Sequence, residues 1–208
     1  MHENARFGPI EWARAGRPLP SEYTSGDRGI AVDLDGEAAL FGVVDGLGHG
    51  PAAATAALCA VDAVKRASSE RLEVLVQLCH RVLDGTRGVA MTLARVDFAA
   101  STLTWTGVGN VTADLVAKAP TGIHIRSSAR LAAGIVGYRI PEIRPAQVVS
   151  IRPGDLLLMA TDGIAEDHLE HIDFAAPAVV IAEELLSKHA KETDDAMVLA
   201  ARHRGVST

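Results

Sequence analysis

Residues 27–51 of this chain, DRGIAVDLDGEAALFGVVDGLGHGP, carry the strongest local signal for its architecture. Two runs of β-prone residues in it, 28–34 and 38–44, flank an Asp35-Gly36 pair. An Asp-Gly pair between two such runs is a strong local signal for a tight turn that joins antiparallel strands. The sequence therefore predicts a β-hairpin here.

The open end of this hairpin carries two aspartates. Because they are equally far from Gly36 in the sequence, Asp27 and Asp45 are expected to face each other to within one residue. Like charges that face each other across antiparallel strands are destabilising. Something cationic is therefore expected between them, and the sequence leaves two candidates open, a salt bridge from Arg28 or a metal ion.

The rest of the chain alternates between helix and strand patterns, and no Pro-, Gly- or Ser-rich linker divides it. Helices are expected at residues 51–66, 69–84 and 177–190. Further strands are expected at residues 88–97, 102–109, 111–118, 147–151, 155–161 and 196–202. This order favours the α+β class, with antiparallel sheets flanked by helices, and residues 1–208 are expected to form one domain.

A second group of aspartates lies at the ends of two predicted strands. Asp162 follows the apolar run 156–160, and Asp194 with Asp195 precedes the apolar run 196–200. If these strands run antiparallel, their aspartates meet at one sheet edge, and four carboxylates can converge. Ligand sets made of oxygen alone favour Mg²⁺ or Mn²⁺ over zinc, and two such ions form the clamp used for phosphate ester hydrolysis.

Five short motifs, each weak alone, follow one another along the chain. They are Ser25-Gly26-Asp27, Val44-Asp45-Gly46-Leu47-Gly48-His49-Gly50, Gly107-Val108-Gly109-Asn110, Thr161-Asp162-Gly163 and Thr193-Asp194-Asp195-Ala196. In order and spacing they resemble the metal-dependent protein phosphatase (PPM, phosphatase 2C-like) family, and more narrowly its bacterial SpoIIE/RsbU/RsbX branch. The similarity runs from about residue 20 to 202. Because no regulatory segment precedes these motifs, the chain is most similar to the short stand-alone phosphatase of the bacterial stressosome.

This resemblance implies a four-layer αββα sandwich with two Mn²⁺ or Mg²⁺ ions at one end of the paired sheets. The residues that would hold the ions, matched by position, are Asp27, Asp45, the carbonyl of Gly46, Asp162 and Asp194. Asp45 would bridge both ions. The family pattern favours Asp194 over Asp195, and a slip of one residue stays open. The implied reaction is hydrolysis of phosphoserine or phosphothreonine in a protein by a water that the two ions activate.

The chain departs from the family pattern in two places. Eukaryotic members carry a histidine directly after Asp-Gly, a proposed proton donor to the leaving group, whereas this chain has Leu47. His49, two residues later, is the nearest alternative acid, and donation by water is the competing interpretation. The family's phosphate-binding arginine has no clear counterpart, although Arg14, Arg17 and Arg28 are available.

Composition excludes several classes of function. With 20 Lys and Arg against 26 Asp and Glu, the chain lacks the basic surplus that nucleic acid binding rewards. The signature of a cysteine phosphatase, with an arginine six positions after the cysteine, is absent for both Cys59 and Cys79. The start of the chain has no secretory pattern, and no run approaches about 18 consecutive apolar residues. A cytoplasmic protein without a membrane or nucleic acid partner is expected.

Three functional interpretations remain at this stage. The first is a PPM-type serine/threonine phosphatase that acts on bacterial stress-signalling proteins, namely the phosphorylated STAS-domain proteins of a stressosome. The second keeps the enzyme but changes the target to an anti-sigma-factor antagonist of another pathway. The third is a non-catalytic metal-binding module with the same fold, which the intact, mutually repelling Asp27, Asp45, Asp162 and Asp194 disfavour.

Overall fold

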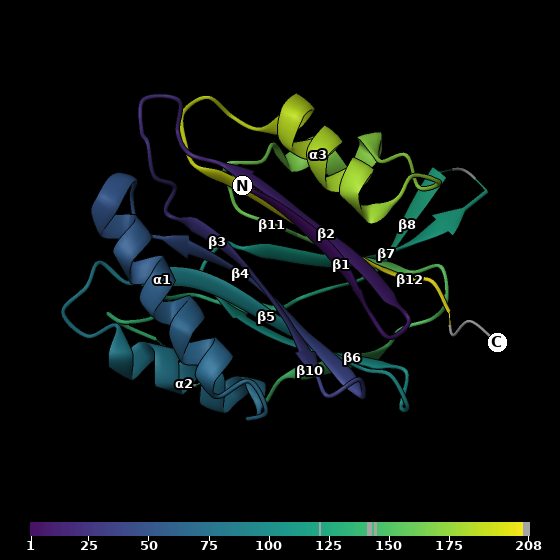
Figure 1. Ribbon diagram of the computed structural model, residues 1–208, viewed down its shortest axis with the longest axis horizontal. Coiled ribbons are helices and arrows are strands. Elements are labelled where there is room, and N and C mark those ends of the chain that lie inside the picture. Colours follow the sequence, from purple (N-terminus) through teal and green to yellow (C-terminus); the bar gives the residue numbers. More distant parts are fainter. Residues whose placement is uncertain (121, 141–142, 144, 206–208) are drawn as a thin grey trace.

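The computed structural model describes residues 1–120, 122–140, 143 and 145–205 (Figure 1). The described helices are α1 (Gly50–Arg66), α2 (Leu72–Val82), α3 (Ala178–His189) and the short 3-10 helix η1 (Glu166–His171). The strands are β1 (His2–Phe7), β2 (Ile10–Arg17), β3 (Asp27–Leu34), β4 (Ala38–Gly46), β5 (Val89–Asp97), β6 (Thr102–Val108), β7 (Thr112–Ala119), β8 (Gly122–Ser128), β9 (Leu131–Ala132), β10 (Gln147–Ser150), β11 (Leu156–Ala160) and β12 (Ala196–His203).

The predicted hairpin is formed by β3 and β4, which pair antiparallel in the expected register. Asp35 and Gly36 both have positive φ angles, 57° and 75°, as a type I′ turn requires. The amide of Glu37 closes the turn by donating to the carbonyl of Leu34 at 3.0 Å. This register pairs Asp27 directly with Asp45, so the prediction that the two aspartates face each other is confirmed.

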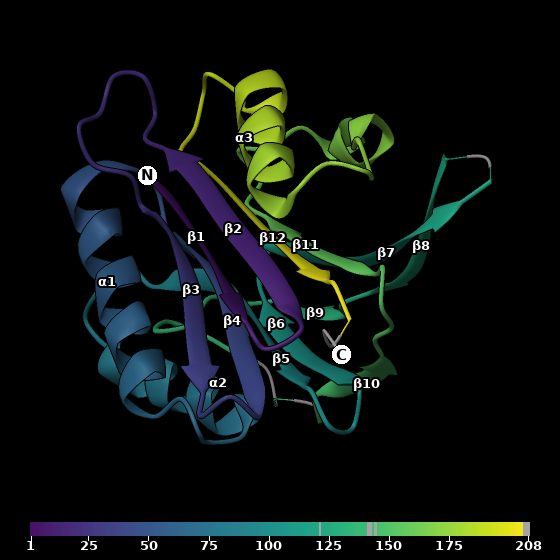
Figure 2. The ribbon, with the colours of Figure 1, turned by 45° about the vertical axis from the view of Figure 1, so that its right-hand side comes forward.

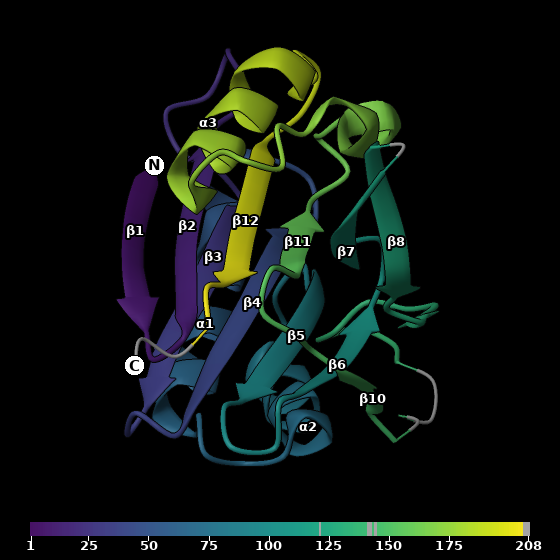
Figure 3. The same ribbon diagram turned by 90° about the vertical axis from the view of Figure 1, so that its right-hand side faces the viewer.

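Two sheets form the centre of the molecule. One has the strand order β1-β2-β12-β11-β7-β8, and the other has the order β10-β6-β5-β4-β3 with β9 added parallel to β6. Figure 3 shows β12 lying between β2 and β11 in the first sheet. All eight residues of β12 are buried, because neighbouring strands cover both edges and packed layers cover both faces.

The sheets pack face to face, and each outer face carries helices (Figure 2). The core between the sheets contains Trp12, Phe41 and Trp105, each at most 2% exposed. A second core joins the β3–β4 sheet to α1 and α2, and a third joins the other sheet to α3. The predicted α+β class with a four-layer αββα sandwich is therefore confirmed.

The N-terminal hairpin, β1 with β2, was not predicted from the sequence, and neither were β8 and β9. β1 is exposed almost throughout, and β2 is rich in alanine and glycine. Neither therefore shows the alternation of large apolar and polar residues from which a strand is predicted. β2 forms because β12 pairs with it from Ala196–Arg17 to His203–Ile10. Its conformation thus depends on a partner almost two hundred residues away.

The helices agree closely with the prediction. α1 begins at Gly50 with Pro51 in its first turn, and α2 begins at Leu72, three residues later than expected. Cys79 is fully buried on the apolar face of α2, as the spacing of its neighbours predicts. Within the described part of the chain, no helix combines the length and apolar character that a membrane span requires.

Candidate metal centre

The predicted aspartates lie where four strand ends meet, two from each sheet. Asp27 begins β3 and Asp45 is the last residue but one of β4. Asp162 lies two residues after β11, and Asp194 two residues before β12. β11 and β12 pair antiparallel, which is the condition under which these two positions share an edge. β12 also lies against β3 and β4 of the facing sheet, so the two pairs of aspartates occupy the same end of the sandwich.

The electrostatics of these residues show that their carboxyl groups act on one another. Burial and the facing Asp45 raise the pKa of Asp27 well above its usual range, and Asp27 is only 1% exposed. Burial and the carboxylates of Asp162, Asp194 and Asp195 raise the pKa of Asp45 to about 7. Burial also raises the pKa of Asp194. An environment that opposes carboxylate charge in this way favours a bound cation.

The salt bridge left open by the sequence does not form in the described structure. Arg28 directs its Nη1 atom to the backbone carbonyls of Ser25 and Asp27, at 2.6 and 2.7 Å. Among the residues described, no arginine or lysine pairs with the carboxylates of Asp27 or Asp45. Buried Asp27 and half-buried Asp45 therefore lack a cationic partner in the described part of the chain, which fits a site for a divalent ion.

The carboxylates do not form a finished cage. Within the described ranges, no three His, Cys, Asp or Glu side chains lie together in a group that could already hold a metal ion. The donor chemistry is nevertheless that of a hard cation, since each candidate side chain offers carboxylate oxygens. The structure thus gathers the predicted ligands at one edge, and their assignment to ions remains a prediction.

The glycine-rich loop between β4 and α1 places backbone close to this edge. A β-carbon on Gly46 would lie 2.3 Å from the carbonyl oxygen of Ala53, so glycine is required where the loop meets the helix. Gly48 and Gly50 have φ angles of 80° and 76°, which other residues rarely adopt. The amide of Gly46 donates to the carbonyl of Gly26 at 3.2 Å and ties the loop to the start of β3.

His49, the predicted acid, lies at the start of α1 on the rim of this edge. Its side chain is 58% exposed, and Nδ1 lies 2.8 Å from Oε1 of Glu22. The imidazole is also near enough to Asp194 to oppose the rise in the pKa of that carboxyl. His49 therefore lies beside the candidate ligands, with its orientation set by Glu22, a partner that the sequence analysis did not identify.

Four further residues of the site make contacts that were not predicted from the sequence. Thr161 donates to Asp27, Asp195 accepts from two backbone amides, Asn110 donates to Asp162 at 2.7 Å, and Lys191 donates to the Asp162 carbonyl at 2.6 Å. Thr161 and Asn110 lie inside motifs that were quoted for the resemblance, which was the available signal. Their roles depend on contacts across the fold and could not be read from spacing.

The arginines considered for phosphate binding are all engaged with backbone. Arg14 donates to the carbonyl of Gly29, and Arg17 donates to the carbonyls of Pro18 and Lys191. Arg28 donates to the carbonyls of Ser25 and Asp27. Arg17 and Arg28 also line a small pocket of about 260 Å³ beside Ser25. The structure therefore gives none of the three a free guanidinium at the aspartates, and the phosphate-binding residue stays unassigned.

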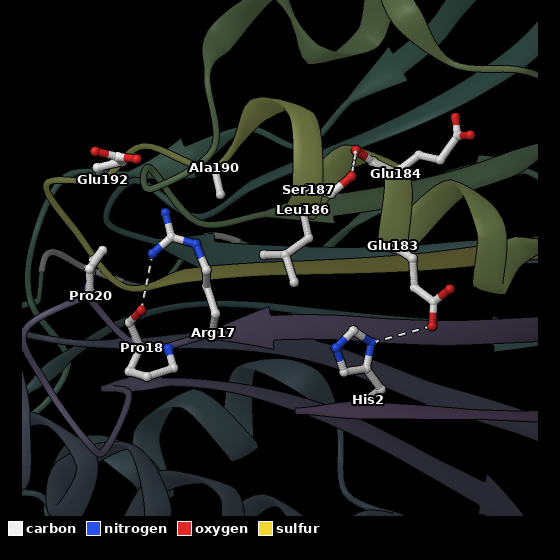
Figure 4. Close-up of a pocket in the computed structure, with 10 residues that line it drawn as sticks. All are labelled: His2, Arg17, Pro18, Pro20, Glu183, Glu184, Leu186, Ser187, Ala190 and Glu192. Carbon is white, nitrogen blue, oxygen red and sulfur yellow. Dashed lines mark hydrogen bonds and ion pairs between the residues drawn. The ribbon is translucent and has the colours of Figure 1, made fainter.

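A larger groove, of about 800 Å³, lies between α3 and the N-terminal hairpin (Figure 4). Its walls include Arg17 of β2, Glu183 and Leu186 of α3, and Glu192 of the loop that leads to Asp194. The lining contains none of the predicted metal ligands. The groove therefore neighbours the candidate centre along the chain but does not contain it.

Comparisons with known proteins identify relatives of this arrangement. Residues 35–204 match the family model described as Stage II sporulation protein E (SpoIIE). One similar solved structure comes from work on the bacterial stressosome, described there as a modular system that has been adapted to control secondary messenger signalling. Its sequence is 30% identical to that of this chain. It superimposes with a TM-score of 0.82 over 93% of this chain and 99% of its own. A crystal structure of RsbX in complex with magnesium is 20% identical, with a TM-score of 0.80 over 97% of this chain and 99% of that one.

A curated relative matches a shorter part of the chain. The chain is 28% identical to phosphoserine phosphatase RsbX of Bacillus subtilis (strain 168) over 80 residues. These 80 residues make up 38% of this chain and 40% of the relative. The facing sheets with helices on both outer faces form a PP2C-like fold. The chain belongs to the SpoIIE family, whose model spans most of its length.

Proposed function

We propose that this chain is a metal-dependent protein serine/threonine phosphatase, with residues 1–208 forming one catalytic domain. The observation that carries the proposal is the facing pair of buried Asp27 and half-buried Asp45, which has no cationic partner among the described residues and shares its edge with Asp162 and Asp194. Two facing buried carboxylates are unfavourable unless a cation compensates them. A domain that binds no cation would leave the repulsion between these carboxylates uncompensated.

The residues that would hold two Mg²⁺ or Mn²⁺ ions are Asp27, Asp45, the carbonyl of Gly46, Asp162 and Asp194. Asp45 would bridge the ions, with Asp27 and Gly46 on one side and Asp162 and Asp194 on the other. The hydrogen bonds support Asp194 over Asp195, because both Asp195 oxygens already accept backbone amides, those of Leu19 and Gly26. Magnesium in the related RsbX structure is consistent with the choice of metal.

The chemistry that a pair of divalent ions supplies is attack of water on a phosphate ester, with the phosphoryl charge neutralised during the displacement. The residues of this chain orient that site. Asn110 holds one oxygen of Asp162, leaving the other for a ligand. His49, held by Glu22 at the start of α1, is the candidate acid that would protonate the departing serine oxygen.

The substrate we propose is a phosphorylated STAS-domain protein of a stressosome, which would place the enzyme in the cytoplasm. The support is the likeness to RsbX, described as a phosphoserine phosphatase, and to a structure from work on the stressosome. An exposed site at a sheet edge suits a protein substrate, because a folded phosphoprotein must reach the ions without entering a deep cavity.

The experiment that tests this function is hydrolysis of p-nitrophenyl phosphate and of a phosphoserine STAS-domain protein, with Mn²⁺, with Mg²⁺ and with excess EDTA. We expect hydrolysis of both substrates with metal and none with EDTA. Hydrolysis of the small ester alone would support a phosphatase with a different protein target. Absence of metal-dependent hydrolysis on both would overturn the proposal in favour of a binding module.

A further inference from the structure

Thr161 is a buried hydroxyl that the proposed chemistry leaves without a role. It follows β11 directly, precedes Asp162 and is 3% exposed. Its Oγ1 lies 2.7 Å from Oδ2 of Asp27 and 3.0 Å from the amide nitrogen of Met197 in β12. The hydroxyl therefore contacts one candidate metal ligand and is itself held by a central strand.

The direction of these two hydrogen bonds follows from the available protons. The amide of Met197 has a proton to donate, so Oγ1 of Thr161 accepts that bond. The single hydroxyl proton is then directed to Oδ2 of Asp27, which accepts. One oxygen of Asp27, Oδ2, is thus engaged by the hydroxyl.

This contact joins the two sheets. Thr161 belongs to the end of β11 in one sheet, and Asp27 begins β3 in the other, 134 residues earlier in the chain. A second link runs in parallel, because the Asp195 carboxylate accepts the amide of Gly26 at 2.6 Å. Asp195 therefore anchors the backbone just before Asp27, while Thr161 anchors the side chain.

We propose that Thr161 is a positioning residue that holds the Asp27 carboxylate in the orientation in which it binds metal. This inference rests on the proposed function, since it assumes that Asp27 is a ligand. A free carboxylate rotates about χ2, and two hydrogen bonds in series from a central strand remove that freedom. Thr161 would act through Asp27 and would not touch the ions or the substrate.

The alternative is that Thr161 only fills space and satisfies the amide of Met197. The two roles differ in what they change. A structural role lowers the stability of the fold and leaves the intrinsic affinity for metal unaltered. A positioning role lowers metal affinity through Asp27, and a residue that keeps the hydroxyl restores it.

The test compares Mg²⁺ and Mn²⁺ dissociation constants of wild type, Thr161→Val and Thr161→Ser, measured by titration calorimetry well below each melting temperature. We expect Thr161→Val to weaken binding about 10–100-fold, as the loss of a partner of a metal ligand does, and Thr161→Ser to stay within about threefold of wild type. The matched control is Thr92→Val. Thr92 is equally buried, and its hydroxyl donates to the backbone carbonyl of Val111 at 2.6 Å and not to a candidate metal ligand.

Thr92→Val should lower the melting temperature and leave the dissociation constants at the wild-type value. A double-mutant cycle with Asp27→Ala adds the direct readout, because alanine offers no side-chain acceptor and loss of the Thr161 hydroxyl should then have no further effect on metal affinity. If Thr161→Val does not fold, Thr161→Ala serves in its place, with a smaller expected loss because water can enter.

Wild-type affinity in Thr161→Val would overturn the positioning role while leaving the proposed function intact. The same holds if the loss of affinity in Thr161→Val persists undiminished in the Asp27→Ala background. Failure of the wild-type protein to bind either ion or to hydrolyse p-nitrophenyl phosphate would instead overturn the proposed function, and with it this inference.

Discussion

Asp45 lies at the point where burial and three neighbouring carboxylates act on one side chain. These influences raise its pKa to about 7 in the metal-free protein. The same side chain is the proposed bridge between two ions. Its charge is therefore unfavourable without metal and needed with metal, so substitution of this residue should separate stability from activity.

We predict that Asp45→Asn lowers metal-dependent hydrolysis by at least about 100-fold and leaves the metal-free protein as stable as wild type or more stable at pH 8. The amide keeps the size of the side chain and removes the repulsion with Asp27. The measurements are turnover of p-nitrophenyl phosphate at saturating Mn²⁺ and the melting temperature in EDTA. Activity within about tenfold of wild type would contradict the bridging assignment.

His49 tests the protonation of the leaving group. A positioned acid contributes about 10²–10⁴-fold where the leaving group is a poor one, such as a serine alkoxide. We predict that His49→Ala slows hydrolysis of a phosphoserine protein far more than that of p-nitrophenyl phosphate, whose phenolate leaves unaided. Equal losses on both substrates, or no loss on either, would reject His49 and favour water as the donor. The variant to compare with His49→Ala is Glu22→Gln, which keeps the histidine and alters the hydrogen-bond partner of its Nδ1 atom.

At the scale of single elements, α1 and α2 hold the two cysteines in contrasting environments. Cys79 is buried against α1, with Sγ 3.7 Å from the carbonyl of Ala60, and burial raises the pKa of its thiol to about 12. Cys59 lies on the exposed face of α1. Because thiolates are the reactive form, the two helices should protect one thiol and expose the other.

We predict that a thiol reagent at pH 8 labels Cys59 rapidly in the native protein and labels Cys79 only after denaturation. Mass spectrometry of the modified peptides distinguishes the two sites. Rapid labelling of Cys79 in native protein would contradict the packing of α2 onto α1. Cys59→Ser is the control, since it should remove the fast reaction and leave the slow one unchanged.

At the scale of the whole molecule, the buried aspartates link folding to pH and to metal. The raised pKa values mean that the folded state holds protons that the unfolded chain releases. This contribution to stability is fully present below the unfolded pKa near 3.8 and is lost as pH rises through the folded values, about 7 for Asp45. The lowered pKa of His203 acts in the opposite direction.

We predict that the melting temperature in EDTA falls by about 5 °C between pH 5 and pH 8, and that Mg²⁺ restores it at pH 8. Asp45→Asn should show a smaller fall, which separates the aspartates from His203. A melting temperature that rises with pH in EDTA, or that is unchanged by Mg²⁺ at pH 8, would contradict the proposed site.

The hairpin, the order of most elements and the positions of the candidate ligands can be predicted from the sequence alone. The Asp35-Gly36 turn and the runs on either side are local features, so they specify the register that pairs Asp27 with Asp45 without reference to the rest of the fold. The apolar runs before Asp162 and after Asp195 likewise predicted two strand ends, whereas the antiparallel pairing of these strands was only a condition, which the structure meets.

The tertiary structure decided what surrounds those ligands. β2 exists as a strand because β12 pairs with it, and the contact from Thr161 to Asp27 spans 134 residues. The contacts of Asp195 also span the fold, because its carboxylate accepts the backbone amides of Leu19 and Gly26. Spacing along the chain specifies partners within a turn or a hairpin, whereas partners across the two sheets depend on how the layers pack, and that is a property of the assembled core.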